Sequence, residues 1–174
     1  MICLVSHDAG GAELLSSWAK NQNKKFLFYI KGPGLDIFKK KIKNFKNSNL
    51  SVIKKKTQVY ITGTSKNSNH ELYFIKYAQK KNIKSISIID HWVNYKERFT
   101  RKNLAIEPNE IWVTDRIALD LAKKVFKKKV ILKKNYYVQD FIKSFKSLSK
   151  KSTKNKNMIL YLTTNTNNEK KDLD

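Results

Sequence analysis

The hydrophobic residues of this chain fall into short apolar runs that alternate with segments of helical spacing. Residues 2–5 and 26–30 are apolar runs bounded by polar residues, which is typical of buried strands. Between them, the apolar residues of segment 12–20 recur at i, i+1, i+4 and i+5, so they share one face of a helix. The first part of the chain therefore predicts a strand, a glycine-containing turn, a helix and a second strand.

The same alternation continues through most of the chain. Further strands are predicted over residues 59–62, 85–89, 110–114 and 130–132, with a short one over 50–53. Helices are predicted over residues 35–45 and 70–81, after a cap at Thr114 or Asp115, and in a last segment that ends near Leu148. Residues 93–106 have no clear period and predict an irregular loop with one helical turn.

Alternating strands and helices are joined by right-handed crossovers, which produce a largely parallel sheet. The sequence thus predicts an α/β fold: a doubly wound, mostly parallel, Rossmann-like sheet with helices on both faces. This domain covers residues 1–148. Residues 149–157 contain no apolar side chain and predict a linker, and residues 158–174 begin with a new apolar run that predicts the start of an incomplete second domain.

The chain is strongly basic, with a formal net charge of +23 in 174 residues. Only Arg98, Arg101 and Arg116 are arginines. Because arginine makes most bidentate contacts with bases and phosphates, the lysine excess disfavours a nucleic-acid-binding protein. AT-rich coding DNA explains an excess of lysine, asparagine and isoleucine without any ligand. The alternative explanations of the lysine excess are attraction to an anionic membrane surface and binding of nucleic acid.

Cysteine content and hydropathy indicate the cell compartment. Cys3 is the single cysteine, so no disulfide can form within the chain, as expected in a reducing environment. The first residues lack a basic segment, and no apolar run approaches the roughly 18 residues needed to span a bilayer. We expect a cytoplasmic protein. Its positive charge also allows peripheral attachment to the inner membrane surface.

Polar loops follow most of the predicted strands. In an open parallel sheet the carboxyl ends of the strands lie along one edge, and ligands bind in the crevice outside them. The loops over residues 6–11, 31–34, 63–67, 90–94 and 114–115 are therefore expected to converge. This edge is the predicted binding site.

The first of these loops contains His7 and Asp8, followed by Gly10 and Gly11. The glycines allow a tight turn into a helix whose N-terminal amides attract anions, and the imidazole and carboxylate are candidate general bases. The alternative is that Asp8 only caps the helix. The loop lacks the full Gly-x-Gly-x-x-Gly pattern, so no dinucleotide cofactor is expected.

The loop after the strand over residues 59–62 contains Thr64 and Ser65, whose hydroxyl groups suit a phosphate or a sugar. The same residues are also common before a helix. The three histidines and Cys3 lack the spacing of a zinc site, so no metal is expected. His70 is expected on an exposed helix.

A further candidate is the segment that follows the strand over residues 85–89. Asp90 and His91 offer polar groups to a sugar, Trp92 offers an aromatic face for stacking, and Arg98 offers a guanidinium group to a phosphate. The alternative is that His91 hydrogen-bonds within its own loop and that Trp92 packs on the sheet.

These motifs together resemble the N-terminal half of GT-B-fold glycosyltransferases and of relatives such as the UDP-sugar 2-epimerases and glycerophosphotransferases. The residues that carry the resemblance are His-Asp-Ala-Gly-Gly-Ala-Glu at 7–13, Thr-Gly-Thr-Ser at 62–65 and Ile-Asp-His-Trp at 89–92. The likeness spans residues 1–148.

The resemblance implies a two-domain enzyme of surface glycan or polysaccharide synthesis. Its N-terminal domain would bind the glycan acceptor and supply the base, His7 or Asp8, while its C-terminal domain would hold the nucleotide-sugar donor. Gly10, Gly11 and Thr64, together with His91, would line the cleft.

The likeness covers only one half of such an enzyme, so we expect catalysis to require a C-terminal half or a partner chain, unless it has been lost. The alternative functions are a non-catalytic nucleotide- or phosphosugar-binding module and a basic protein that binds nucleic acid or a membrane surface.

Overall fold

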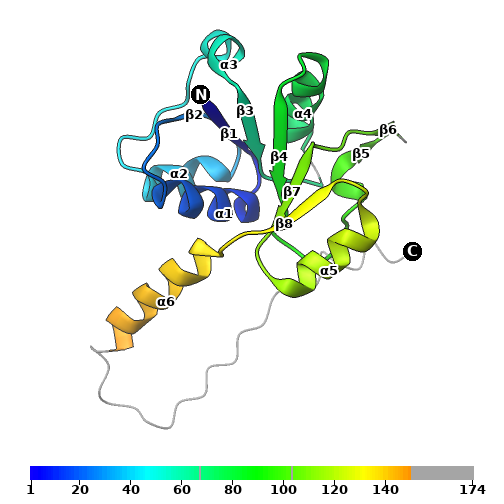
Figure 1. Ribbon diagram of the computed structural model, residues 1–174. Helices are drawn as coiled ribbons and strands as arrows, with labels where there is room; N and C mark the ends of the chain where they lie inside the picture. Colours follow the sequence, from blue (N-terminus) through cyan, green and yellow to red (C-terminus); the bar gives the residue numbers. More distant parts are fainter. Residues whose placement is uncertain (67, 103, 150–174) are drawn as a thin grey trace, which may run out of the picture. The chain divides into compact units, whose positions relative to one another are not determined.

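The central element is a sheet of six parallel strands in the order β2-β1-β3-β4-β7-β8 (Figure 1). The computed structural model describes residues 1–66, 68–102 and 104–149. Residues Met1–Phe141 form one unit and Ile142–Asp174 a second, and the fold described is that of the first. The strands are β1 (Ile2–Ser6), β2 (Phe26–Ile30), β3 (Val59–Thr62), β4 (Lys84–Ile88), β7 (Glu110–Val113) and β8 (Lys129–Leu132).

Helices connect most of these strands. They are α1 (Ala9–Lys20), α2 (Gly34–Lys41), α3 (Leu50–Lys56), α4 (His70–Lys80), α5 (Arg116–Val125) and α6 (Tyr136–Ser149). Between β4 and β7 the chain forms a 3-10 turn, η1 (Glu97–Phe99), and an antiparallel pair, β5 (Thr100–Arg101) with β6 (Leu104–Ala105). The predicted helical turn in residues 93–106 is thus present, and the small antiparallel pair was not predicted.

Both faces of the sheet are covered. Side chains alternate between the faces along each strand. Leu4 and Ile61 pack with α1 and α2, whereas Val5 and Tyr60 lie in the cluster that includes Ile53 of α3 and apolar residues of α4. The apolar stripe of α5 covers the same second face beside β7. The predicted doubly wound α/β fold, Rossmann-like and parallel, is therefore confirmed.

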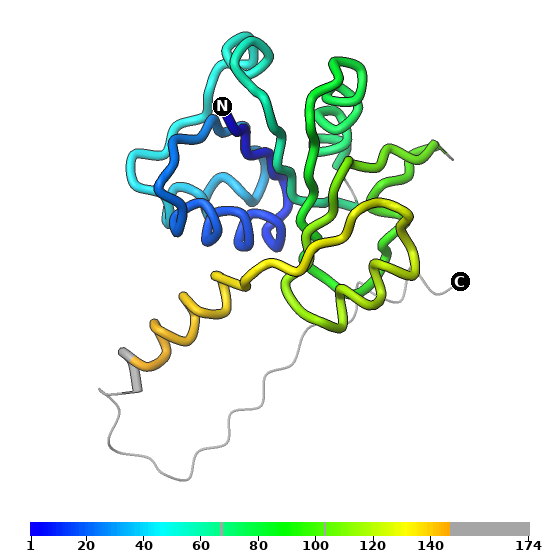
Figure 2. Tube along the Cα trace, in the orientation of Figure 1, coloured from blue at the N-terminus to red at the C-terminus, as the bar shows by residue number. Residues whose placement is uncertain are grey.

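The chain reverses its direction of winding at β1. It passes from β1 outward to β2 and then returns to β3, on the other side of β1, before continuing through β4 and β7 to β8 (Figure 2). Consequently α1 and α4, which follow β1 and β3, leave on opposite faces of the sheet. Such a reversal opens the crevice in which ligands bind in this fold class.

The loops on the two sides of this reversal pack against each other through glycines. A Cβ atom added to Gly63 would lie 2.7 Å from Oγ of Ser6 and 3.2 Å from Cα of Gly11. Both distances are shorter than ordinary van der Waals contact. The absence of side chains at Gly11 and Gly63 thus lets α1 begin directly beside the end of β3.

The outer edge of β2 is covered without a further strand. The side chain of Asn47 accepts a hydrogen bond from the amide of Ile30 and donates one to its carbonyl, both at 2.8 Å. The amide of Ser48 donates to the carbonyl of Phe28 at 2.8 Å. The prediction of a strand over residues 50–53 is wrong, because these residues open α3 and their short apolar run packs as a helix face through Ile53.

Other boundaries differ by a few residues. Helix α2 ends at Lys41 rather than near residue 45, because the backbone of Ile42 is extended. Ser149, predicted as the first linker residue, is the last residue of α6. The remainder of the predicted linker and the predicted second domain, residues 150–174, lie outside the described residues. Among the described residues, no helix is both long and apolar enough to cross a membrane.

Replacing Gly63 with alanine tests the close approach of the two loops. We expect Gly63→Ala to lower the free energy of unfolding by about 1–3 kcal/mol, because the new methyl group overpacks a buried contact. Urea unfolding measures the loss. Ser6→Gly in the same chain removes the oxygen of the shortest contact, so the double variant should lose less than the sum of the two single losses. Strict additivity of the two losses would contradict the contact.

Candidate functional site

The parallel sheet brings every predicted site residue to its carboxyl edge. His7 and Asp8 follow β1, Gly10 and Gly11 lie in the first turn of α1, Thr64 and Ser65 follow β3, Asp90, His91 and Trp92 follow β4, and Arg98 lies in η1. Within this edge the residues separate into a cavity, a pair of arginine-linked loops and a cluster around His7. The three groups differ in chemistry.

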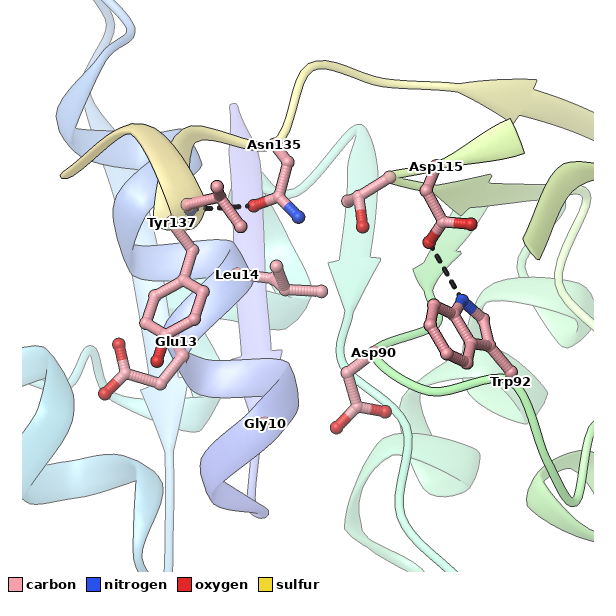
Figure 3. Close-up of a pocket in the computed structure, with 10 residues that line it drawn as sticks. Gly10, Glu13, Leu14, Asp90, Trp92, Asp115, Asn135 and Tyr137 are labelled. Carbon is pink, nitrogen blue, oxygen red and sulfur yellow. Dashed lines mark hydrogen bonds between the residues drawn. The ribbon is translucent and has the colours of Figure 1, made fainter. Parts of the chain in front are cut away.

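The cavity has a volume of about 300 Å³ and is built from α1 and the loops after β4, β7 and β8. Glu13 and Tyr137 lie on one side of it, Trp92 and Asp115 lie on the other, and Asp90 points in from below (Figure 3). Gly10, Leu14, Thr114, Asn135 and Val138 complete the lining. The cavity thus combines three carboxylates, an amide and two aromatic rings.

Trp92 is held at the rim of the cavity by a hydrogen bond. Its indole Nε1 donates to Oδ2 of Asp115 at 3.0 Å, while Oδ1 of the same carboxylate accepts from the amide of Ala118 and caps α5 (Figure 3). The side chain of Trp92 is 52 % exposed. The ring is therefore oriented by the end of β7 and is not packed on the sheet, as one alternative had suggested.

A second carboxylate of the cavity is paired with a lysine. Glu13 forms an ion pair with Lys41 of α2, and the same ammonium group donates to Oγ of Ser17 at 2.9 Å. Both partners are partly exposed. Glu13 was not a predicted site residue, because its position on a helix resembles that of any solvent-facing acid.

Arg98 links the loops after β3 and β4. Its Nη1 donates to Oδ1 of Asp90 and to Oγ1 of Thr64, each at 2.7 Å, and its Nε donates to the carbonyl of Val93 at 3.2 Å. The other oxygen of Asp90 lies over Gly10, where an added Cβ would be only 1.8 Å away. Arg98 thus fixes the carboxylate of Asp90 against α1, and its predicted contact with a phosphate stays a prediction.

Arg101 organises the loop between β3 and α4. Its Nη2 donates to the carbonyls of Ser65, Lys66 and Ser68 at 2.7–3.1 Å, and its Nε donates to Oδ1 of Asn69 at 2.8 Å. Asn69 therefore uses its side chain to bind Arg101 and does not cap α4 with it. The scarcity of arginine in this lysine-rich chain could have marked Arg101 as a structural residue, because only a planar guanidinium group serves several carbonyls at once.

His7 and Asp8 lie beside the cavity and do not line it. Nδ1 of His7 is 2.7 Å from Oδ1 of Asp8. Gly32, with a φ of +51°, packs against the opposite edge of the ring, since a Cβ there would be 2.6 Å from Nε2. Asp8 occupies the N-cap position of α1 without a capping side-chain bond. Its carboxylate therefore binds His7 and not the helix.

The backbone of His7 rests on a buried acid that the sequence analysis missed. Oε1 of Glu71 accepts a hydrogen bond from the amide of His7 at 2.7 Å, and Glu71 is 1 % exposed. Oε2 is buried and has no hydrogen-bond partner among the described residues. Burial raises the pKa of Glu71, and the hydrogen bonds from the backbone only partly offset this. An acid in the first turn of a helix usually faces solvent, so nothing in the sequence marked Glu71.

His70 differs from its prediction, which placed it on an exposed helix surface. It is half-buried, stacks on the ring of Tyr29 at a centroid distance of 5.3 Å, and has Nε2 3.0 Å from the carbonyl of Tyr29. Burial lowers the pKa of His70. The helix begins beside β2, and that position encloses the ring.

His91 is exposed and interacts within its own loop. Its Nδ1 accepts a hydrogen bond from the amide of Trp92 at 3.0 Å. With Asp90 and Trp92 it lines a smaller hollow of about 190 Å³ next to the cavity. The structure therefore shows the alternative prediction for His91, a hydrogen bond within its own loop. A role for His91 in ligand binding stays a prediction.

The single cysteine lies in the core, away from the candidate cavity. Burial raises the pKa of Cys3 to about 12, so its thiol stays protonated at neutral pH. No group of three or more histidine, cysteine, aspartate or glutamate side chains suited to a metal ion occurs within residues 1–66, 68–102 and 104–149.

Comparison with known proteins adds no assignment. No family model, no curated protein and no solved structure matches the chain. The site must therefore be interpreted from its own geometry.

Replacing Glu71 with glutamine tests the buried carboxyl group. Because the pKa of Glu71 is raised in the folded protein, the unfolded chain ionises first as pH rises. The free energy of unfolding therefore falls as pH rises from the unfolded pKa to the folded pKa, and it stays lowered above both. Glutamine keeps an oxygen for the amide of His7 and does not titrate. We expect Glu71→Gln to be more stable than the wild type at pH 8, with a difference that shrinks as pH falls toward about 4.5.

Urea unfolding across this pH range measures the difference. Glu97→Gln, which removes the same charge from an exposed position, is the matched control, and the change of the difference with pH should be larger for Glu71→Gln. A constant difference for Glu71→Gln would mean that Glu71 is ionised normally in the folded protein.

Proposed function

We propose that the cavity at the carboxyl edge binds a sugar and that this domain is the acceptor-side half of a GT-B-type glycosyltransferase of glycan synthesis. The observation that carries the proposal is Trp92, fixed by Asp115 at the rim of a cavity that also contains Asp90 and Glu13. The carboxylates suit the hydroxyl groups of a sugar, and the indole suits an apolar face of its ring.

The carboxylates suit the hydroxyl groups of a sugar. A carboxylate only accepts hydrogen bonds, and each sugar hydroxyl has a proton to donate. Asp90 uses one oxygen for Arg98, whereas Asp115 uses one oxygen for the cap of α5 and the other for the indole of Trp92. The amide of Asn135 adds a group that both donates and accepts. Because these partners hold the acids in place, little side-chain entropy is lost on binding.

The aromatic residues suit the apolar faces of a sugar. The C–H groups on one face of a pyranose pack on an aromatic ring, and the half-exposed indole of Trp92 offers such a surface. Tyr137 lies on the other side of the cavity (Figure 3). A ring bound between them would have both faces covered.

Size and charge favour an acceptor over a nucleotide-sugar donor. A cavity of about 300 Å³ is at the small end of the range of about 300–1,000 Å³ for ligand sites. The residues that line it also include no lysine or arginine to pair with a diphosphate. The donor would then bind to another domain, as the resemblance implies. The base candidates Asp8 and His7 lie beside the cavity, so only an acceptor longer than one sugar would reach them.

A binding module for phosphosugars, without catalysis, is the second candidate function. Its supporting observation is that the ring of His7 packs against Gly32 and does not line the cavity, so no histidine base faces a ligand there. In this case Arg98 would turn from Asp90 to a phosphate group.

Titration with methyl glycosides of common hexoses and N-acetylhexosamines, followed by saturation-transfer NMR, tests the sugar site. We expect Trp92→Ala to weaken binding about fivefold, because an aromatic stacking contact contributes about 1 kcal/mol, and Trp92→Phe to retain most of it. Tyr73→Ala, which removes another half-exposed aromatic ring, is the control and should have no effect. Equal binding by Trp92→Ala and the wild type would refute the site.

A comparison of glucose with glucose 1-phosphate separates the two candidate functions. The acceptor proposal predicts that the unphosphorylated sugar binds at least as tightly, since carboxylates line the cavity. Tighter binding of the phosphosugar to the wild type would favour the binding module instead.

A further inference from the structure

The opposite edge of the sheet, where the strands begin, is covered with lysines. The connections over residues 20–25, 54–58, 80–84 and 123–129, from the last turn of a helix to the next strand, contain three, three, three and five lysines. All of these lysines are exposed, and none of the four connections contains an aspartate or a glutamate. We call this surface the lysine face.

Helix dipoles explain only part of the lysine face. Lysines in the last turn of a helix are stabilised by its negative end, and Lys54–Lys56 at the end of α3 fit this account. Lys24 and Lys25, however, lie beyond α1, and residues 127–129 lie beyond α5, outside the range of that effect. Stabilisation of helix ends therefore does not explain the lysines that lie beyond the helices.

Acidic residues offset little of this charge. Glu110 at the start of β7 is bound by Lys84 at 3.2 Å and by the indole of Trp112 at 2.6 Å. Lys20 is 4.0 Å from Asp140. Both pairs involve a lysine at one end of a connection, and neither involves Lys25, Lys55 or Lys128, which lie in three of the four connections.

An apolar groove adjoins the lysine face beside β2. Its volume is about 580 Å³, and its apolar lining includes Phe26, Phe28 and Ile42. Lys24 and Lys25 border it, together with Lys43 after α2. Cationic groups around an apolar depression are complementary to the headgroups and upper acyl chains of an anionic lipid layer.

We propose that the lysine face binds an anionic membrane surface, with the groove receiving the apolar part of the interface. The proposal does not depend on the sugar site. It requires no transmembrane helix, because lysines near a charged bilayer attract it through the surface potential. Bound in this way, the protein keeps its carboxyl edge, and thus the candidate sugar site, turned away from the lipid.

The residue types favour a membrane over nucleic acid. Nucleic-acid binding uses arginine forks and exposed aromatic platforms for bases. Arg98 and Arg101 are instead hydrogen-bonded within the carboxyl-edge loops, and Phe26 and Phe28 pack partly buried against neighbouring rings. The lysine face therefore offers charge and an apolar groove without groups that read bases.

Sedimentation with phosphatidylcholine vesicles containing about 30 mol % phosphatidylglycerol tests the proposal at about 0.1 M salt. We expect the wild-type chain to bind these vesicles and not vesicles of phosphatidylcholine alone. The triple variant Lys25→Glu, Lys55→Glu, Lys128→Glu should bind at least about tenfold more weakly, because it inverts one charge in each of three connections.

The matched control inverts the same number of charges on the carboxyl edge. Lys96→Glu, Arg116→Glu, Lys134→Glu should change vesicle binding less than about threefold, and circular dichroism melting should show both triple variants folded. Equal losses for the two variants, or no binding by the wild type, would refute the lysine face as the contact surface. Displacement from vesicles by a mixed-sequence RNA at equal charge concentration would assign the face to nucleic acid and overturn the proposal.

Discussion

The constraint on which the rest of this structure depends is that all six strands of the main sheet run in the same direction. Every strand then ends at one edge and begins at the other, so residues far apart in the sequence share a surface. The close approach of Gly11 and Gly63 joins the two halves of the sheet at the point where the winding reverses. Direct pairing of β1 with β3 holds the two strand ends together, and the missing side chains of Gly11 and Gly63 let α1 begin beside them.

The carboxyl edge is organised by a few directional hydrogen bonds. Arg98 ties the loop after β4 to Thr64, Arg101 holds the loop after β3 through several carbonyls, and Asp115 joins the start of α5 to Trp92. Each of these groups serves two elements of the chain at once. The segment between β4 and β7 also has a core of its own, since Tyr95, Phe99 and Ile106 are buried, and the directional links add to these apolar contacts.

The two edges of the sheet differ in where their charged groups gather. Acids from α1 and from the loops after β4 and β7 meet around one cavity, whereas lysines gather where helices return to the sheet. In a chain with a formal net charge of +23, each carboxylate of the cavity has a partner: Glu13 pairs with Lys41, Asp90 with Arg98, and Asp115 binds Trp92 and caps α5. The proposed sugar site and the proposed membrane contact lie on different edges, so they do not compete for the same surface.

Local patterns alone determined the fold class, because the spacing of apolar residues depends only on neighbouring positions. Segment 26–30 was predicted with its observed bounds, and the common edge of His7, Thr64 and Asp90 followed from the parallel direction. Residues 50–53 were misjudged because a short apolar run suits a strand or a helix equally, and Asn47 closes the sheet edge instead. The burial of Glu71 and the bond from Trp92 to Asp115 were decided by tertiary structure, since they depend on distances between loops that no local pattern contains.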